Sequence, residues 1–529
     1  MDLYFIAQQK GWPEELSVLK YELLPFNPKT FQDITVILFG AIGDGVCLLY
    51  ALKAFKEQFP DVIVRIIVEH PLDEFMQCSF IDEVIVFDEP DFARIKELKK
   101  ETDIVLNLHS TYRSALLAYF LAGKNALGLS INGKEVFLRG NLWQLFFHRV
   151  FYPKFLHKRL EEVNILGRVP MLSLCLGIKP YKLQALPRIK SDDSNFEIRG
   201  EYIVIVPDAN APSRIWPLDK YIVLAEKILD RFADLSVVFI GKDVKGGIKT
   251  TERLFDLRGK TSLSSAIDII SNARYLLSND TGMIHIAGVF QIPTLIVCGP
   301  NNVGPEAKGR YLSVRKIVDC SPCREAFCES MKCMKELSVE DVFSCFRKLV
   351  EFVDGKEDNS SLLDRKDLSI GYSYDEEVDL FFDYHPFTLP YEGKTVLGDA
   401  LYRYLIVFIY LKESGIDIPI MEFKDYIKRH FVFSQQQLKE LQEQIGAFFD
   451  SVKRPLLLVV EKVGILKNKN VSSLKVLDAL KKVCLQVPEE LIFPLSDGGL
   501  SDIDVSLARA VDRCVYGKEL LIKLIDELL

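Results

Sequence analysis

The chain has 529 residues, of which 49% are hydrophobic and 26% charged. This composition is typical of globular proteins and excludes disordered and collagen-like classes. Lys and Arg total 66 against 74 Asp and Glu, so the formal net charge is −8, which argues against general binding of nucleic acids. At roughly 150 residues per domain, the length predicts about three domains.

No apolar run reaches the ~20 residues that a membrane-spanning helix needs. The first residues also lack the basic and apolar regions of a secretory leader, so we expect a cytoplasmic protein.

Residues 1–32 carry leucines at roughly helical spacing, and we expect a helical N-terminal extension there. Between residues 33 and 165, short β-rich runs alternate with amphipathic segments, as in a parallel sheet with helices on both faces. The same alternation returns in residues 201–353. The proline-rich and polar stretch 166–200 separates these two regions, and we interpret it as an interdomain link.

Residues 369–529 follow a polar linker and lose the alternation, so we expect a mainly helical extension of unknown role. The predicted fold class is therefore α/β, with two Rossmann-like doubly wound domains and a mainly helical C-terminal domain. Because ligands of doubly wound sheets bind at the carboxyl ends of the strands, the chemistry is expected at strand-to-helix turns.

The first such turn, residues 40–45, reads GAIGDG between a predicted strand and a predicted helix. Its glycines let the backbone approach a ligand, and the free amides of a helix start attract negative charge. Asp44 is either a helix cap or a group with a chemical role. Glu69, near the end of the next predicted strand, leaves a nicotinamide-dependent enzyme open, because an acid at that place binds ribose in dinucleotide folds.

The second turn, residues 207–217, places Arg214 before a Trp-Pro pair that opens a helix. A guanidinium there could clamp a phosphate with two parallel hydrogen bonds. The alternative is an ordinary surface charge. Trp216 is expected to be a core anchor rather than a ligand-binding residue.

The third turn, residues 279–285, reads NDTGMIH. Asp280, Thr281 and Gly282 offer a carboxylate, a hydroxyl and free amides at the positive end of a helix, which suits the diphosphate of a nucleotide sugar. His285 lies about one turn further along the same face, although an isolated helical histidine is usually structural.

Five motif-bearing segments occur one after another along the chain. They are FGAIGDGVCLLYALKAFKEQFP (39–60), DIVLNLHSTYRSALLAYFLAG (103–123), SRIWPLDKY (213–221), LRGKTSLSSAIDIISNARYLLSNDTGMIHIAGVFQIPTLIVCGP (257–300) and CSPCREAFCESMKCMKELSVEDVF (320–343). Together they resemble the ADP-heptose:lipopolysaccharide heptosyltransferases, glycosyltransferase family 9. The resemblance implies a GT-B fold, with the nucleotide sugar held mainly by the second Rossmann-like domain and the acceptor by the first.

The resemblance also implies an activity. A heptose would pass from ADP-heptose to a lipopolysaccharide-core acceptor with inversion, and the transfer would need no cofactor. It makes Asp44, beside Gly43, the candidate general base for the acceptor hydroxyl. The donor-binding candidates are Arg214, where the family usually has lysine, and Asp243, Asp280, Thr281, Gly282 and His285.

The resemblance also implies that the acceptor side lies near Gly43, His109 and Arg113, because the last two follow the strand-like run before residue 109, where the family's first domain faces its acceptor. Arg113 could contact an acidic acceptor or could be a solvated helix charge. The expected partners are a nucleotide-sugar donor and a lipopolysaccharide-core acceptor, with peripheral contact at the inner face of the cytoplasmic membrane and no nucleic acid.

Four of the 11 cysteines lie close together, with the spacing C-x2-C-x4-C-x4-C. They are Cys320, Cys323, Cys328 and Cys333. Four thiolates at such spacing can enclose zinc or iron. Cysteine-rich segments recur here in the family, and one branch that glycosylates autotransporter proteins is associated with iron held by such cysteines. Reduced core cysteines are the alternative, and a reducing compartment disfavours a disulfide.

Three other functions remain open at this point. The acceptor could be a protein, which would make the chain a protein O-heptosyltransferase with a metal-bound cysteine cluster. The fold could serve as a non-catalytic scaffold that binds nucleotides or carbohydrates. The third is the nicotinamide-dependent enzyme.

Overall fold

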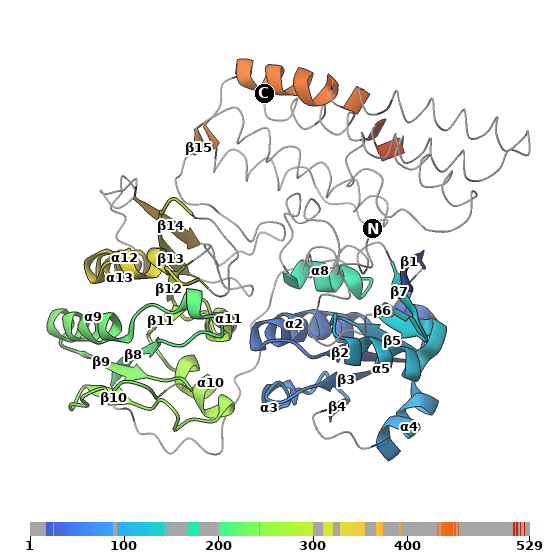
Figure 1. The fold of residues 1–529 in the computed structure, drawn as a ribbon, viewed down its shortest axis with the longest axis horizontal. Helices are drawn as coiled ribbons and strands as arrows, with labels where there is room; N and C mark the ends of the chain where they lie inside the picture. The colour runs from blue at the N-terminus through green and yellow to red at the C-terminus, as the bar shows by residue number, and fades with distance from the viewer. Residues whose placement is uncertain are drawn as a thin grey trace, which may run out of the picture.

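A computed structural model of the chain describes the residues that follow. They are 17–24, 26–87, 92–141, 144, 168–178, 198, 200–242, 244–299, 310–320, 328–354, 367–373, 391–392, 431–432, 435–447, 449–450, 453, 512–513, 515–516, 519 and 523. Two large α/β units lie side by side (Figure 1).

The first unit is built on a seven-stranded sheet with the order β1-β7-β6-β5-β2-β3-β4. The strands are β1 (Ser17–Leu23), β2 (Asp33–Leu38), β3 (Ile63–Val68), β4 (Glu83–Val86), β5 (Ile104–Asn107), β6 (Ala126–Asn132) and β7 (Glu135–Gly140). The run β4-β3-β2-β5-β6 is parallel throughout. The chain winds outward from β2 in one direction and then returns to β5 on the other side, so this sheet is doubly wound.

Helices cover both faces of this sheet. They are η1 (Pro28–Thr30), α2 (Ile42–Gln58), α3 (Asp73–Met76), α4 (Phe92–Glu101), α5 (Tyr112–Ala122), η2 (Gly123–Asn125) and α8 (Arg168–Cys175). The strand β2 is buried along its whole length. Its Ile34 and Val36 join the core cluster that contains α2 and α8, whereas Ile37 joins the cluster formed with α4 and α5. A strand buried on both faces needs a nearly continuous apolar run, which ITVIL provides with Thr35 as its one polar residue.

The second unit has a seven-stranded sheet with the order β10-β9-β8-β11-β12-β13-β14. The strands are β8 (Glu201–Val206), β9 (Leu235–Phe239), β10 (Leu254–Asp256), β11 (Tyr275–Asn279), β12 (Thr294–Cys298), β13 (Tyr311–Lys316) and β14 (Leu368–Ser373). The helices are η3 (Pro212–Arg214), α9 (Leu218–Arg231), α10 (Leu263–Ser271), α11 (Gly282–Val289), α12 (Lys332–Glu336) and α13 (Val339–Val353). Up to β13 the order follows the doubly wound dinucleotide-binding pattern. The expected pair of Rossmann-like domains, as in a GT-B fold, is confirmed.

The secondary structure differs from the prediction in three segments. Within the expected helical extension 1–32, residues Ser17–Leu23 form β1, parallel to β7, because the alternation of Leu19, Tyr21 and Leu23 with Lys20 and Glu22 has the period of a strand. The expected link 166–200 begins with α8, which packs on α2.

The third segment is the C-terminal extension. Residues Leu368–Ser373 form β14, which pairs antiparallel with β13 and closes the edge of the second sheet. Beyond it, residues 391–392 and 431–432 form a short two-stranded ladder, and residues 435–447 are helical. Most of the predicted helical extension 369–529 lies outside the described residues.

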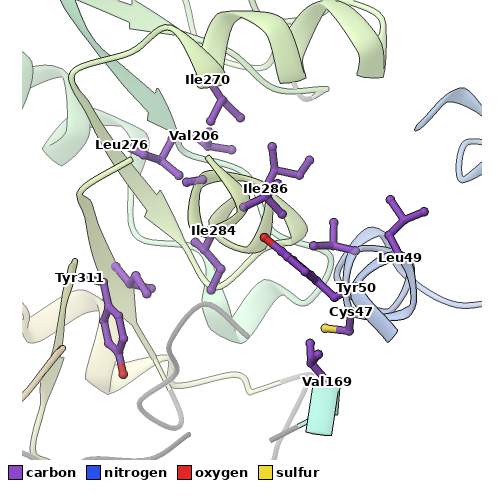
Figure 2. Close-up of a cluster of buried hydrophobic side chains, with 14 of the residues drawn as sticks. Cys47, Leu49, Tyr50, Val169, Val206, Ile270, Leu276, Ile284, Ile286 and Tyr311 are labelled. Carbon is purple, nitrogen blue, oxygen red and sulfur yellow. The ribbon is translucent and has the colours of Figure 1, made fainter. Parts of the chain in front are cut away.

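The two units share an apolar contact between α2 and α11. Tyr50 extends from α2 toward Ile286 of α11, while Cys47 on the same helix lies near Val169 of α8 (Figure 2). These residues belong to one buried cluster that continues from the first unit into the second. The carboxyl-side turns of both sheets are therefore held near each other. Among the described residues, no helix is both long and apolar enough to cross a membrane.

Candidate functional site

Each sheet reverses its winding at one place, and the predicted turns lie there. In the first sheet, residues 40–45 follow β2 and His109 follows the neighbouring strand β5. In the second sheet, residues 207–217 follow β8 and residues 279–285 follow the neighbouring strand β11. Ligands of open α/β sheets bind at such reversal points, so the fold brings the expected turns together in pairs.

The first turn holds Asp44 in the opening turn of α2. The Ala41 amide donates to Oδ2 of Asp44 at 3.1 Å, which is one half of a capping box. Oδ1 of the same carboxylate forms an ion pair with the guanidinium of Arg168 from α8. Asp44 therefore caps its helix, as one of the two interpretations expected. Its arginine partner was not predicted, because Arg168 lies in the stretch that was interpreted as a link.

Arg214 and Asp280 come from different turns of the second sheet and meet in the structure. The guanidinium Nη1 of Arg214 lies 2.9 Å from Oδ2 of Asp280. Arg214 stays 47% exposed and Asp280 18% exposed, so the pair remains accessible from solvent. Thr281 caps α11, because its Oγ1 accepts from the Met283 amide at 3.1 Å.

Asn279 fixes the second turn against the third. Its buried side chain accepts at Oδ1 from the Trp216 amide at 3.2 Å and from the Tyr221 hydroxyl at 3.0 Å. Its Nδ2 donates to the Pro207 carbonyl at 2.5 Å. Trp216 is fully buried, which confirms it as a core anchor. Sequence reasoning quoted Asn279 within its motif but gave it no role.

The first and third turns are in direct contact across the two units. A Cβ added at Gly43 would lie 2.5 Å from Cδ2 of His285, and one added at Gly282 would lie 2.8 Å from Cβ of Ile42. Only residues without a side chain allow this approach. The starts of α2 and α11 therefore meet, and both present free amides and positive dipole ends. Such a place attracts an anion.

His109 and Arg113 lie at the carboxyl edge of the first sheet, as expected. Arg113 Nη1 is 3.0 Å from Oε1 of Glu69, and its guanidinium lies 5.1 Å from the centre of the Phe87 ring. The Phe39 ring stacks on Phe87 at 5.2 Å and contacts the His109 ring at 6.2 Å. Burial lowers the pKa of His109 to about 4, so this imidazole is neutral at pH 7.

The donor candidate Asp243 lies outside the described residues. The preceding residue, Lys242, is described, and its amide donates to Oδ2 of Asp208 at 2.5 Å. Asp208 follows β8. Gly241 has φ +152°, and a Cβ there would collide with the Asp208 carboxylate. The reversal point of the second sheet thus carries a carboxylate that was not singled out from the sequence.

The cysteine segment is described only in part, because Cys323 lies outside the described residues. Cys320 is exposed, Cys328 is half-buried and Cys333 is buried. The Met331 amide donates to Sγ of Cys328 at 3.4 Å. Within the described part of the chain, no three His, Cys, Asp or Glu side chains gather as metal ligands. The three described cysteines therefore do not fit a preformed metal site by themselves.

Comparison with known proteins identifies one family. Residues 92–335 match the model of glycosyltransferase family 9 (heptosyltransferase). Lipooligosaccharide heptosyltransferase 2 of Haemophilus influenzae is 24% identical over 224 residues, which are 39% of this chain and 63% of that protein. The chain thus spans less than two thirds of the length of that relative.

Two further similarities cover nearly the whole of the other protein. Lipooligosaccharide heptosyltransferase 2 of Campylobacter jejuni is 27% identical over 330 residues, 58% of this chain and 96% of that one. A solved glycosyl transferase family 9 structure from Veillonella parvula has a TM-score of 0.47 at 17% identity, covering 62% of this chain and 99% of that one. Residues 92–335, somewhat less than half of the chain, are thus similar to glycosyltransferase family 9.

Proposed function

We propose that this chain is a glycosyltransferase that moves a heptose from ADP-heptose to a lipopolysaccharide-core acceptor with inversion at the anomeric carbon. The observation that carries the proposal is the meeting of the α2 and α11 starts, with Arg214 on one side and Asp44 on the other. The relatives in Haemophilus influenzae and Campylobacter jejuni are named lipooligosaccharide heptosyltransferases, which supports heptose as the sugar.

The second domain would bind the donor. Displacement of a nucleoside diphosphate builds negative charge on the leaving oxygen, and preorganised donors stabilise that charge. The exposed Arg214 guanidinium and the amides at the start of α11, with the Thr281 hydroxyl, would supply these donors. Asp280 holds Arg214 beside the helix start. The pairing also leaves other guanidinium N–H groups for a phosphate, because guanidinium carries five donors.

The first domain would supply the acceptor and the base. The acceptor hydroxyl oxygen forms a bond to the anomeric carbon while the bond from that carbon to the phosphate oxygen breaks. The proton of the hydroxyl passes to Asp44, and ADP leaves with the electron pair. A single displacement of this kind inverts the anomeric configuration. Phe87 and His109, half-buried at the same sheet edge, form an aromatic wall together with the buried Phe39 that contacts both rings, and a sugar ring could pack on its exposed part.

The proposed location follows from the proposed acceptor. A lipopolysaccharide-core acceptor is anchored in a membrane by its lipid, so the enzyme would work as a cytoplasmic protein in peripheral contact with the inner face of the cytoplasmic membrane. A protein acceptor stays the alternative within the same chemistry.

The test is a transfer assay with the purified full chain, ADP-heptose and heptose-free lipopolysaccharide, reading ADP release and the mass gain of the acceptor. We expect both signals from the wild type. Asp44→Asn keeps the size and most of the capping ability of Asp44, and we expect it to lower turnover by roughly 10²–10⁴-fold. Asp61→Asn, at an exposed turn after α2, is the matched control and should behave as wild type.

The outcomes separate the parts of the proposal. Absence of ADP release by the wild type would contradict the activity. If ADP is released with a protein acceptor but not with lipopolysaccharide, the acceptor is a protein rather than the lipopolysaccharide core. If Asp44→Asn keeps turnover within a few-fold of wild type, Asp44 is only a cap.

A further inference from the structure

Arg168 connects the turn that holds Asp44 to a helix more than 120 positions later in the chain. It is the first residue of α8, which packs along α2 in the first domain (Figure 1). Val169, the next residue, belongs to the buried cluster with Cys47 and Tyr50 of α2 (Figure 2). The backbone of Arg168 is therefore anchored by apolar packing, which fixes where its side chain starts.

The Asp44 carboxylate is held from two sides. Its Oδ2 accepts from the Ala41 amide, and its Oδ1 pairs with the Arg168 guanidinium. Two donors on the two oxygens fix the plane of the carboxylate as well as its position. The side chains of Arg168 and Asp44 are 24% and 19% exposed, so salt screens this pair less than it screens a surface pair, while solvent and an acceptor hydroxyl still have access.

A base must be ionised and must be correctly aimed. A cation beside a carboxylate favours the ionised form, and Arg168 supplies that cation at Asp44. Among the described residues, the titratable group that lies against this turn is His285, which contacts Gly43, and the Arg214–Asp280 ion pair lies at the turns of the second sheet. These groups belong to the second domain and do not change when Arg168 is replaced.

We propose that Arg168 is a positioning residue that keeps Asp44 ionised and aimed at the acceptor hydroxyl. The proposal rests on the proposed function, because Asp44 needs this support only if it acts as a base. A purely structural role is the competing explanation: Arg168 would then fasten α8 to α2 and have no effect on proton transfer.

The experiment compares Arg168→Gln, Arg168→Lys and Arg274→Gln in the transfer assay. Arg274 pairs with Glu201 at the surface of the second domain and is the matched control. We expect Arg168→Gln to lower kcat by about 10- to 100-fold, as for partners that orient a functional side chain, with the KM for ADP-heptose unchanged. The acid limb of its pH–rate profile should move to higher pH, because the cation that favours the ionised carboxylate is gone.

Two further readouts address the structural explanation. Methylguanidinium added to Arg168→Gln should restore part of the lost rate. The kcat of Arg168→Lys, which keeps the charge, should lie between those of Arg168→Gln and wild type. The double variant Arg168→Gln, Asp44→Asn should lose no more kcat than Asp44→Asn alone, because the effects of residues that act as a unit are not additive.

The proposal is overturned if Arg168→Gln keeps the wild-type pH profile and does not respond to methylguanidinium, even if its melting temperature falls. Should Arg168→Gln fail to fold, kcat is read from Arg168→Lys, and a kcat equal to that of wild type overturns the proposal. Inactive wild-type protein would instead contradict the proposed function, so the two failures are distinguishable.

Discussion

Asn279 determines the geometry of the turns that we propose to bind the donor, although it carries no charge. It binds the backbone of the second turn, the amide of Trp216 and the hydroxyl of Tyr221 at once. Because all of these groups are buried, each would be left without its partner if the amide were lost, and such a loss is costly. The position of Arg214, two residues before Trp216, therefore depends on a neutral side chain in the core.

The residue-scale prediction concerns His109 and pH. Burial holds its pKa at about 4 in the folded protein, below the ordinary value of about 6.5. Between these values the unfolded chain binds a proton that the folded chain does not, so stability falls as pH drops from 6.5 toward 4. We expect His109 to lower the free energy of unfolding by about 2 kcal/mol when the pH falls from 7 to 5.

Urea unfolding at pH 7 and pH 5 measures this loss. His109→Gln, which has no proton to bind, should lose about 2 kcal/mol less than wild type over the same interval. His70→Gln, at an exposed histidine, serves as the control. Equal losses for wild type and His109→Gln would show that the imidazole is not buried as described.

At the scale of elements, the contact between α2 and α11 brings the proposed donor and acceptor turns together. The contact depends on Gly43 and Gly282, which let one helix start approach the other. Sequence reasoning identified both glycines through their turns and motifs. It could not show that they face each other, because that contact joins residues about 240 positions apart.

Gly282→Ala tests this contact. Alanine is a better helix former than glycine, so an isolated α11 would gain stability. In the folded chain the new methyl would lie 2.8 Å from Cβ of Ile42, and overpacking of this kind costs about 1–3 kcal/mol. We expect a lower melting temperature than wild type.

Gly247→Ala is the matched control, because a Cβ there meets nothing within 4 Å. Its melting temperature should stay at or slightly above that of wild type. If Gly282→Ala is as stable as Gly247→Ala, the two helix starts do not touch.

The cysteine segment 320–333 carries the second element-scale prediction. The spacing of the four cysteines predicts about one equivalent of zinc or iron in the purified protein. Cys323→Ser should lose this metal and part of the thermal stability. Cys78→Ser, at a half-buried cysteine of the first domain, is the control. Metal-free wild-type protein of normal stability and activity would favour reduced structural cysteines, in keeping with the dispersed Cys320, Cys328 and Cys333.

At the scale of the whole molecule, the alternation of strands and helices was sufficient to predict two Rossmann-like domains, because each βαβ unit has a local pattern. The edges of the sheets were not predictable in this way. β1 pairs with β7 and β14 with β13, and these partners are distant in the sequence. Arg168 was missed for the same reason: its ion pair with Asp44 depends on where α8 packs, and the local sequence does not contain that information.

In the proposed function, the reversal points of the two sheets have different roles. One sheet presents Asp44 and the aromatic wall, and the other presents Arg214, Asp280 and the start of α11. A transferase that joins two substrates needs such a pair of surfaces, with the anionic leaving group next to positive charge.

The central claim is that the second of these surfaces binds the diphosphate of an ADP-sugar, and calorimetric titration of ADP-heptose into the purified chain tests it most directly. Because hydrogen bonds to charged groups contribute about 1.5–3 kcal/mol, Arg214→Ala should raise the Kd by roughly 10- to 100-fold, whereas the control Arg274→Ala should bind as wild type does. Wild-type protein that does not bind ADP-heptose, or Arg214→Ala protein that binds it as tightly as wild type, would contradict the account.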